Sequence, residues 1–237
     1  MQTSLENIWD SERKLTMIIK ATQTASNIKQ EYDIYADDRC FKGQLGSASK
    51  LQHIYLSGND LLLKGDYVLS RPSDYIPFKY IFGYSKITER FKVSRNGEEY
   101  AEIKHSTDGI CKGRYIITTV NGEKFECYCR TKKSFDYISV YHTERQVALV
   151  ETYLNVSDYK YTHKAYLLDE YKEYWDLIAF FILYYASYNY AQRFHMSSGS
   201  SYSYGWSFSF YNKKYNPKWR EENFPDENFF GKLNRFG

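Results

Sequence analysis

A strong excess of charge of either sign is missing from this 237-residue chain. Its 32 lysines and arginines are nearly balanced by 29 aspartates and glutamates, which gives a formal net charge of +3. A nucleic-acid-binding domain usually gathers its basic residues into one positive stripe. The small, dispersed charge therefore argues against nucleic acid as a partner and leaves a mild attraction to anionic surfaces.

We also expect neither a secretory leader nor a disulfide framework. Residues 1–6 contain no basic segment followed by an apolar one, so we expect a cytoplasmic protein. In a reducing compartment, thiols in a chain of this length usually pack in the core rather than form disulfides. The chain has four cysteines, Cys40, Cys111, Cys127 and Cys129.

The motifs of the common enzyme classes are also missing: there is no G-x-S-x-G elbow, no phosphate-binding glycine loop and no H-E-x-x-H. Cys127 and Cys129 face the same side of a strand, but no second ligand pair stands at a zinc-site spacing, which favours packing thiols. The histidines occur singly, at positions 53, 105, 142, 163 and 195. We expect no catalytic residue, no metal and no cofactor; an enzyme with a pocket in a barrel mouth stays an open alternative.

Aromatic residues, in contrast, are abundant: they make up 19% of the chain, and 26 of them are tyrosines. Such side chains favour half-buried strands, and short apolar runs recur between turn residues at intervals of about 8 to 12 residues. We expect strands at residues 15–21, 31–36, 40–46, 52–56, 61–70, 78–84, 90–94, 100–104, 115–120, 124–129, 135–141, 147–154 and 159–167.

Two Asn-Gly pairs, Asn96-Gly97 and Asn121-Gly122, lie between such runs. Asn and Gly tolerate the positive φ angles of tight primed turns, so each pair predicts a β-hairpin. About a dozen strands would be unusual in one open sheet, and closure removes exposed edges. The sequence therefore predicts a mainly β protein, a closed antiparallel β-barrel of about twelve strands.

The pattern changes after residue 169, where acidic residues precede a stretch, 177–186, that is apolar on every side. A membrane span needs about 20 apolar residues, whereas Asp176 and Ser187 interrupt this run on its two sides. We therefore favour a buried core helix over a transmembrane one. We predict a central hydrophobic helix at 169–194 that fills the barrel, because an empty interior would be destabilising.

These patterns divide the chain into an N-terminal extension (1–14), a barrel with its central helix (15–195) and a Ser- and aromatic-rich C-terminal tail (196–237). Exposed aromatic side chains are typical interface anchors. One hypothesis is therefore a structural or protein-interaction domain that uses the aromatic tail, residues 202–215, to dock on a protein partner.

The order of these features resembles the tubby C-terminal-like superfamily, in particular its LURP-one-related and phospholipid-scramblase-like branch. The resemblance covers residues 15–195 and lies in a series of short strands followed by the apolar helix: Glu31–Tyr35, Asp60–Leu63, Glu98–Ile103, Ala148–Glu151 and Trp175–Ala191. It implies a twelve-stranded barrel around a central hydrophobic helix. It further implies phosphoinositide headgroup binding by basic residues of the barrel wall, as in tubby proteins, and membrane association, as in scramblase-like relatives.

Basic residues are concentrated in two predicted turns, at Lys112 and Arg114 and at Arg130, Lys132 and Lys133. Strand pairing through the Asn121-Gly122 hairpin would bring the strand ends that carry them side by side. The leading hypothesis is a non-enzymatic binding module that recognises anionic lipid headgroups with these five residues and associates peripherally with membranes. The alternative is that they are solvated strand-end cations that discourage edge pairing.

Overall fold

The computed structural model describes residues 16–26, 30–46, 53–68, 90–107, 113–132, 135–155, 160–189, 214, 216 and 218–225. Strands make up most of this part, and they are β1 (Thr16–Ser26), β2 (Gln30–Ala36), β3 (Arg39–Leu45), β4 (Ile54–Gly58), β5 (Leu61–Val68), β6 (Arg90–Arg95), β7 (Glu98–Thr107), β8 (Gly113–Thr119), β9 (Lys124–Lys132), β10 (Phe135–His142), β11 (Arg145–Asn155) and β12 (Lys160–Leu168). The helices are the 3-10 helix η2 (Asp169–Tyr174), α2 (Trp175–Asn189) and α3 (Trp219–Asn223).

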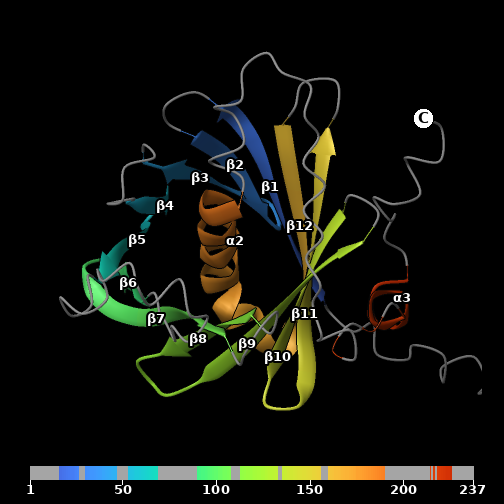
Figure 1. Cartoon of the computed structure of the whole chain (residues 1–237). Coiled ribbons are helices and arrows are strands. Elements are labelled where there is room, and N and C mark those ends of the chain that lie inside the picture. The colour runs from blue at the N-terminus through green and yellow to red at the C-terminus, as the bar shows by residue number, and fades with distance from the viewer. Residues whose placement is uncertain are drawn as a thin grey trace, which may run out of the picture.

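The twelve strands form one closed antiparallel barrel (Figure 1). Each strand pairs with its neighbours along the chain, and β12 pairs with β1 from Thr16↔Leu168 to Thr22↔Thr162. Closure leaves no strand of this sheet with an unpaired edge, which confirms the predicted fold class. The predicted strand at 78–84 lies outside the described residues; β5 pairs directly with β6.

The two Asn-Gly hairpins differ in their turns. Asn96 and Gly97 have φ angles of 52° and 92°, as a tight primed turn between β6 and β7 requires. Between β8 and β9 only Gly122 has a positive φ, of 87°, and Thr119 N donates to Glu123 O at 2.9 Å across a longer loop. The hairpin at this place is confirmed but the two-residue primed turn is wrong, because the longer loop requires a left-handed residue at only one place.

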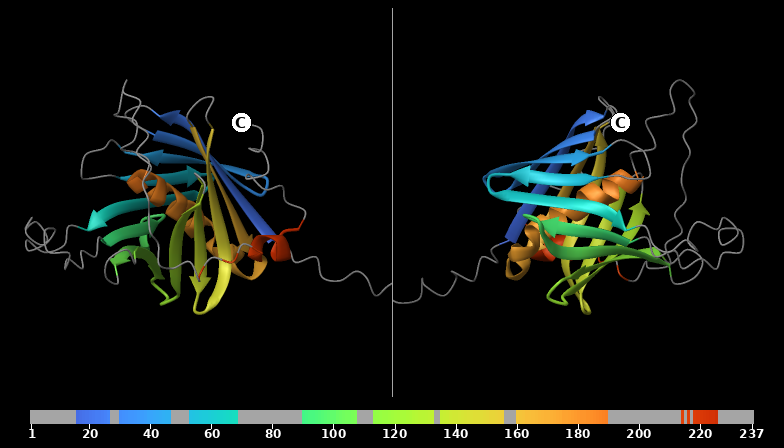
Figure 2. Two further views of the ribbon diagram at one scale, coloured as in Figure 1. Left: turned by 45° about the vertical axis from the view of Figure 1, so that its right-hand side comes forward. Right: turned by 90° about the vertical axis from the view of Figure 1, so that its left-hand side faces the viewer.

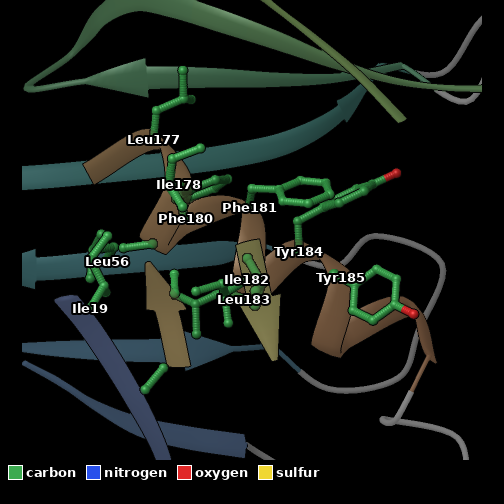
Figure 3. Close-up of a cluster of buried hydrophobic side chains, with 14 of the residues drawn as sticks. Ile19, Leu56, Leu177, Ile178, Phe180, Phe181, Ile182, Leu183, Tyr184 and Tyr185 are labelled. Carbon is green, nitrogen blue, oxygen red and sulfur yellow. The ribbon is translucent and has the colours of Figure 1, made fainter. Parts of the chain in front are cut away.

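Helix α2 runs through the interior of the barrel, as Figures 1 and 2 show. Every residue from Leu177 to Ala186 is at most 6% exposed. Figure 3 shows most of these side chains together with Ile19 of β1 and Leu56 of β4. A helix that is apolar on every side can be accommodated in water only when all of its faces are covered. The prediction of a buried central helix is therefore confirmed for α2. The predicted bounds, 169–194, are wrong at the start, because residues 169–174 form the 3-10 helix η2 and none of them is buried, and residues 190–194 lie outside the described residues. Among the described residues, no helix is long and apolar enough to span a membrane.

Polar contacts anchor the N-terminal end of α2 to the barrel. Asp176 is fully buried; its Oδ1 accepts hydrogen bonds from the Tyr100 hydroxyl at 3.0 Å and from Leu177 N at 2.8 Å. Its Oδ2 lies 3.3 Å from Arg95 Nε. Burial raises the pKa of Asp176, while Arg95 and these hydrogen bonds oppose the rise. These contacts place the start of α2 beside the β6–β7 turn. We call the opposite end of the barrel, at which α2 terminates, the distal end.

Two glycines allow α2 to approach the strands closely. A Cβ atom on Gly43 would lie 2.8 Å from Leu183 Cδ2, and one on Gly65 would lie 2.5 Å from Phe180 Cζ and 2.1 Å from Phe91 Cε1. The rings of Phe91 and Phe180 are fully buried and have little room to move.

Gly65→Ala should therefore destabilise the protein by about 1–3 kcal/mol, the usual effect of overpacking a core. The measurement is the midpoint of urea unfolding. Ser57→Ala, on the outer side of neighbouring β4, is the control and should change stability by less than about 0.5 kcal/mol. An unchanged midpoint for Gly65→Ala would show that the helix is not packed against β5.

Candidate functional site

Arg114 and Arg130 both lie at the distal end of the barrel. β8 begins at this end and β9, its antiparallel partner, terminates there, with pairing from Tyr115↔Cys127 to Thr118↔Lys124. Arg130 shares the outer face of β9 with Glu126 and Tyr128, because alternate residues of a strand point to the same side. Of the other predicted site residues, Lys112 and Lys133 lie outside the described residues, and only the backbone of Lys132 is described.

Arg114 shares a carboxylate with a second cation. Its Nη1 lies 3.4 Å from Glu126 Oε2 and 3.5 Å from the Tyr128 hydroxyl, and Lys124 Nζ lies 2.9 Å from Glu126 Oε1. Burial opposes ionisation of Glu126, but hydrogen bonds from Tyr128 and Lys124 and the charge of Arg114 lower its pKa. The carboxylate is thus ionised at neutral pH, and one negative charge faces two positive ones.

The same arrangement recurs two strands away, on the outer face of β6 and β7. Arg90 and Lys104 are directly opposite one another in the β6–β7 register, and both contact Glu102. Lys104 Nζ lies 2.7 Å from Glu102 Oε2. Like charges directly opposite in a sheet are destabilising unless something compensates them. Burial opposes ionisation of Glu102 as well, yet hydrogen bonds from Arg90 and Lys104 lower its pKa.

These side chains belong to one continuous surface. Ile116 of β8 pairs with Lys104 on one side and with Glu126 on the other, so only β8, which carries Arg114, lies between the strands of Glu102 and Glu126. We call the surface the basic wall and define it by Arg90, Lys92, Lys104, Arg114, Lys124 and Arg130. Its ion pairs include those of Arg90 and Lys104 with Glu102, of Lys92 with Glu99, and of Arg114 and Lys124 with Glu126.

The sequence pattern misses four of the six residues of the basic wall. It places Arg90, Lys92, Lys104 and Lys124 only in strands, because nothing local marks a lysine on one hairpin as the neighbour of an arginine on the next. The single usable signal is alternation: Arg90 and Lys92 are two residues apart in a strand and therefore share its outer face.

A second cluster joins three elements at the end of the barrel where α2 begins. His142 Nε2 lies 2.6 Å from Glu123 Oε2, and its Nδ1 lies 3.1 Å from the hydroxyl of Tyr171 in η2. Both ring nitrogens are engaged, so the imidazole as placed has no lone pair left for a metal ion or a substrate proton. This cluster ties η2 to the β8–β9 loop and to β10.

Two further ionisable groups are buried in β11 and β12. His163, 1% exposed, faces the interior, where its Nδ1 lies 2.8 Å from Thr152 Oγ1, and burial lowers its pKa to about 3. Glu151, 2% exposed, faces outward, and burial raises its pKa to about 7, against the charges of Arg220 and Lys164 and a hydrogen bond from Tyr166. The sequence does contain a signal for Glu151, because this carboxylate directly follows the apolar residues 147–150.

Cys127 and Cys129 are placed for packing, whereas Cys40 is exposed, contrary to the expectation, and Cys111 lies outside the described residues. The side chain of Cys127 is fully buried, and burial raises the pKa of both Cys127 and Cys129. A thiol with a raised pKa is a poor nucleophile and a poor metal ligand at neutral pH. Across the described ranges, no three His, Cys, Asp or Glu side chains gather as a set of metal ligands.

Comparisons with known proteins give no match to a family model, to a curated protein or to a solved structure. The resemblance to the tubby C-terminal-like superfamily therefore stays a prediction, and the functional argument depends on the geometry of the chain itself.

Proposed function

We propose that the protein is a non-enzymatic binding module that recognises anionic phospholipid headgroups with its basic wall and thereby associates peripherally with membranes. The observation that supports this proposal is the sharing of Glu102 and of Glu126 by two cations each. A carboxylate shared by two cations leaves a net positive charge at each of these two groups, and that charge can attract a further anion.

The geometry of the pairs also suits exchange. Lys124 and Arg90 are exposed, and ion pairs at an exposed surface contribute only about 0–1 kcal/mol each. A phosphate group can therefore replace a carboxylate as the partner at little expense, and the arginines can hold it through two N–H groups at once. In the sequence, Lys112 directly precedes β8 and Lys133 directly follows β9.

Binding to liposomes that contain an anionic phosphoinositide should be salt-sensitive and should depend on Arg114 and Arg130 of the wall together with the lysines near them in sequence. A variant with Lys112, Arg114, Arg130, Lys132 and Lys133 changed to glutamine should partition at least about 100-fold more weakly, since each charge near an anionic leaflet contributes about 1 kcal/mol. The measurement is co-sedimentation over a salt series, with neutral liposomes as the reference.

The control variant removes five cations from other parts of the surface: Lys20, Lys42, Arg145, Lys172 and Lys218, each changed to glutamine. It has the same net charge as the test variant and should bind at least about ten times better. An equal loss of liposome binding in both variants would show that binding depends on net charge alone and not on the predicted site. Absence of wild-type binding would contradict the lipid proposal and favour a protein-interaction domain.

The predicted docking of the tail through residues 202–215 stays a prediction, because only Lys214 of that stretch is described. Lys214 lies on the protein's own barrel: its backbone oxygen accepts a hydrogen bond from the Tyr141 hydroxyl at 2.8 Å.

A further inference from the structure

The outer face of β10–β12 is apolar where a solvent-facing barrel wall is usually polar. Tyr137, Leu149, Tyr166 and Leu168 form a hydrophobic cluster that is separate from the core around α2. Each is at most 6% exposed because a segment from outside the barrel covers it. These four side chains are not part of the core that fills the barrel. They instead form an apolar surface for a contact on the outside of the barrel.

A carboxylate stands among these apolar side chains. Glu151 is opposite Tyr137 on one side and Lys164 on the other, and its Oε2 accepts a hydrogen bond from the Tyr166 hydroxyl at 3.2 Å. A buried carboxylate is unfavourable unless a cation or hydrogen-bond donors compensate it. The face therefore has two requirements, apolar surface at its edges and a cation near its centre.

The segment that covers the face meets both requirements. Trp219 of α3 donates from Nε1 to Gln146 O at 3.2 Å, and Phe224 packs edge-on against Tyr166 with ring centroids 5.1 Å apart. Between them, the guanidinium of Arg220 lies 5.6 Å from the centre of the Tyr166 ring. Figures 1 and 2 show α3 on the outside of the barrel.

The contact has the features of one that can be exchanged. Arg220 Nε is 3.8 Å from Glu151 Oε1, and the Arg220 side chain also interacts with Tyr166. Helix α3 has only five residues, and no side chain caps its N-terminus. A helix of this length is not stable alone, so the barrel wall imposes its conformation.

We propose that the outer face of β10–β12 is a docking site for a short peptide segment of a protein partner that presents an aromatic residue, an adjacent arginine and a second aromatic residue four positions after the arginine. Trp219, Arg220 and Phe224 occupy this site in the free protein, and a partner segment with the same pattern displaces them. The site adjoins the basic wall, because Tyr137 is directly opposite Arg130 in the β9–β10 register, but it shares no residue with that wall.

The test uses full-length protein and a fluorescent peptide with the sequence of residues 214–226. In an open-site variant, Trp219→Ala with Phe224→Ala, the chain's own segment no longer fills the site. Fluorescence anisotropy should show at least tenfold tighter binding of the peptide to this variant than to the wild type. Glu151→Gln in the open-site background, or Arg220→Glu in the peptide, should reverse the gain.

The matched control is Glu221→Ala with Glu222→Ala, which alters the exposed side of α3 and should bind the peptide as weakly as the wild type does. A folded open-site variant that fails to bind the peptide would overturn the proposal. So would a wild-type dimer that exchanges its C-terminal segments, because the occupant would then be a second copy of this chain.

If the open-site variant does not fold, a second measurement decides. A protease site is inserted between residues 200 and 201 of the wild-type chain, and the segment is cleaved in the folded protein. Exchange of the cleaved segment for labelled peptide supports the proposal, and a segment that stays bound against excess peptide overturns it.

Discussion

Replacing Phe181 with aspartate is expected to abolish cooperative folding. The Phe181 ring is fully buried in the middle of α2, 5.6 Å from the ring centre of Tyr115 and 6.2 Å from that of Tyr184. An unpaired charge at such a place costs several kcal/mol and also removes the packing of the ring, against a total stability of about 5–15 kcal/mol. The measurement is circular dichroism during thermal unfolding of the purified variant.

Two controls separate charge and burial. Val120→Asp introduces the same charge at a side chain that is 58% exposed and should change stability by less than about 0.5 kcal/mol. Phe181→Leu keeps the apolar character and should lose about 1–3 kcal/mol while unfolding cooperatively. A soluble, cooperatively unfolding Phe181→Asp protein would contradict the placement of α2 in the core.

The second large effect expected is a loss of stability in acid that arises from His163. Its pKa is lowered from about 6.5 in the unfolded chain to about 3 by burial, so the neutral imidazole is favoured in the fold. This contribution is complete above pH 6.5 and is lost as the pH falls toward 3, because the unfolded state then binds the proton. At pH 4 the loss amounts to about 3 kcal/mol.

Glu151 acts in the opposite direction over part of this range. Its pKa is raised from 4.5 to about 7, so its contribution to stability is complete below pH 4.5 and is lost as the pH rises through 7. Between pH 7 and 4.5 the two groups therefore largely cancel in the wild type. Below pH 4.5 only the loss from His163 continues.

Urea unfolding between pH 7.5 and 4 checks both signs. Glu151→Gln should begin to lose stability near pH 6.5, about two units before the wild type, whereas His163→Gln should gain stability as the pH falls to 4.5. Differences from the wild type at each pH cancel the titration of other groups. Parallel curves for all three proteins would show that neither group is buried as described.

The secondary structure could be predicted because its causes are local. Alternation of apolar and polar residues at positions such as Arg90 to Ser94 reports a strand with one buried face. Asn96-Gly97 supplies the two positive φ angles of the turn that follows. The loop at Asn121-Gly122 was less predictable, because the same two residues suit both a two-residue turn and the longer loop that is present.

The candidate sites were predictable only in part, because they are assembled from residues that are distant in sequence. Arg114 and Arg130 were found, since one hairpin carries both. Arg90 and Lys104 belong to another hairpin, and their place beside Glu126 depends on the pairing of β7 with β8. Arg220 contacts Glu151 because α3 packs on the barrel wall. This segment is not a strand of the sheet, so the sequence pattern of the strands does not predict where it packs.

The sequence by itself determined which segments are strands, that 177–186 must be buried on every side, and that a dozen strands close into a barrel around it. These features could be predicted because the periodicity and hydrophobicity that determine them are local properties of the sequence, set by residues a few positions apart. Only the tertiary structure decided which charges share a carboxylate and which wall of the barrel is covered by α3. Those contacts depend on strand register and on the docking of a distant segment, and both are set by the packing of the whole chain.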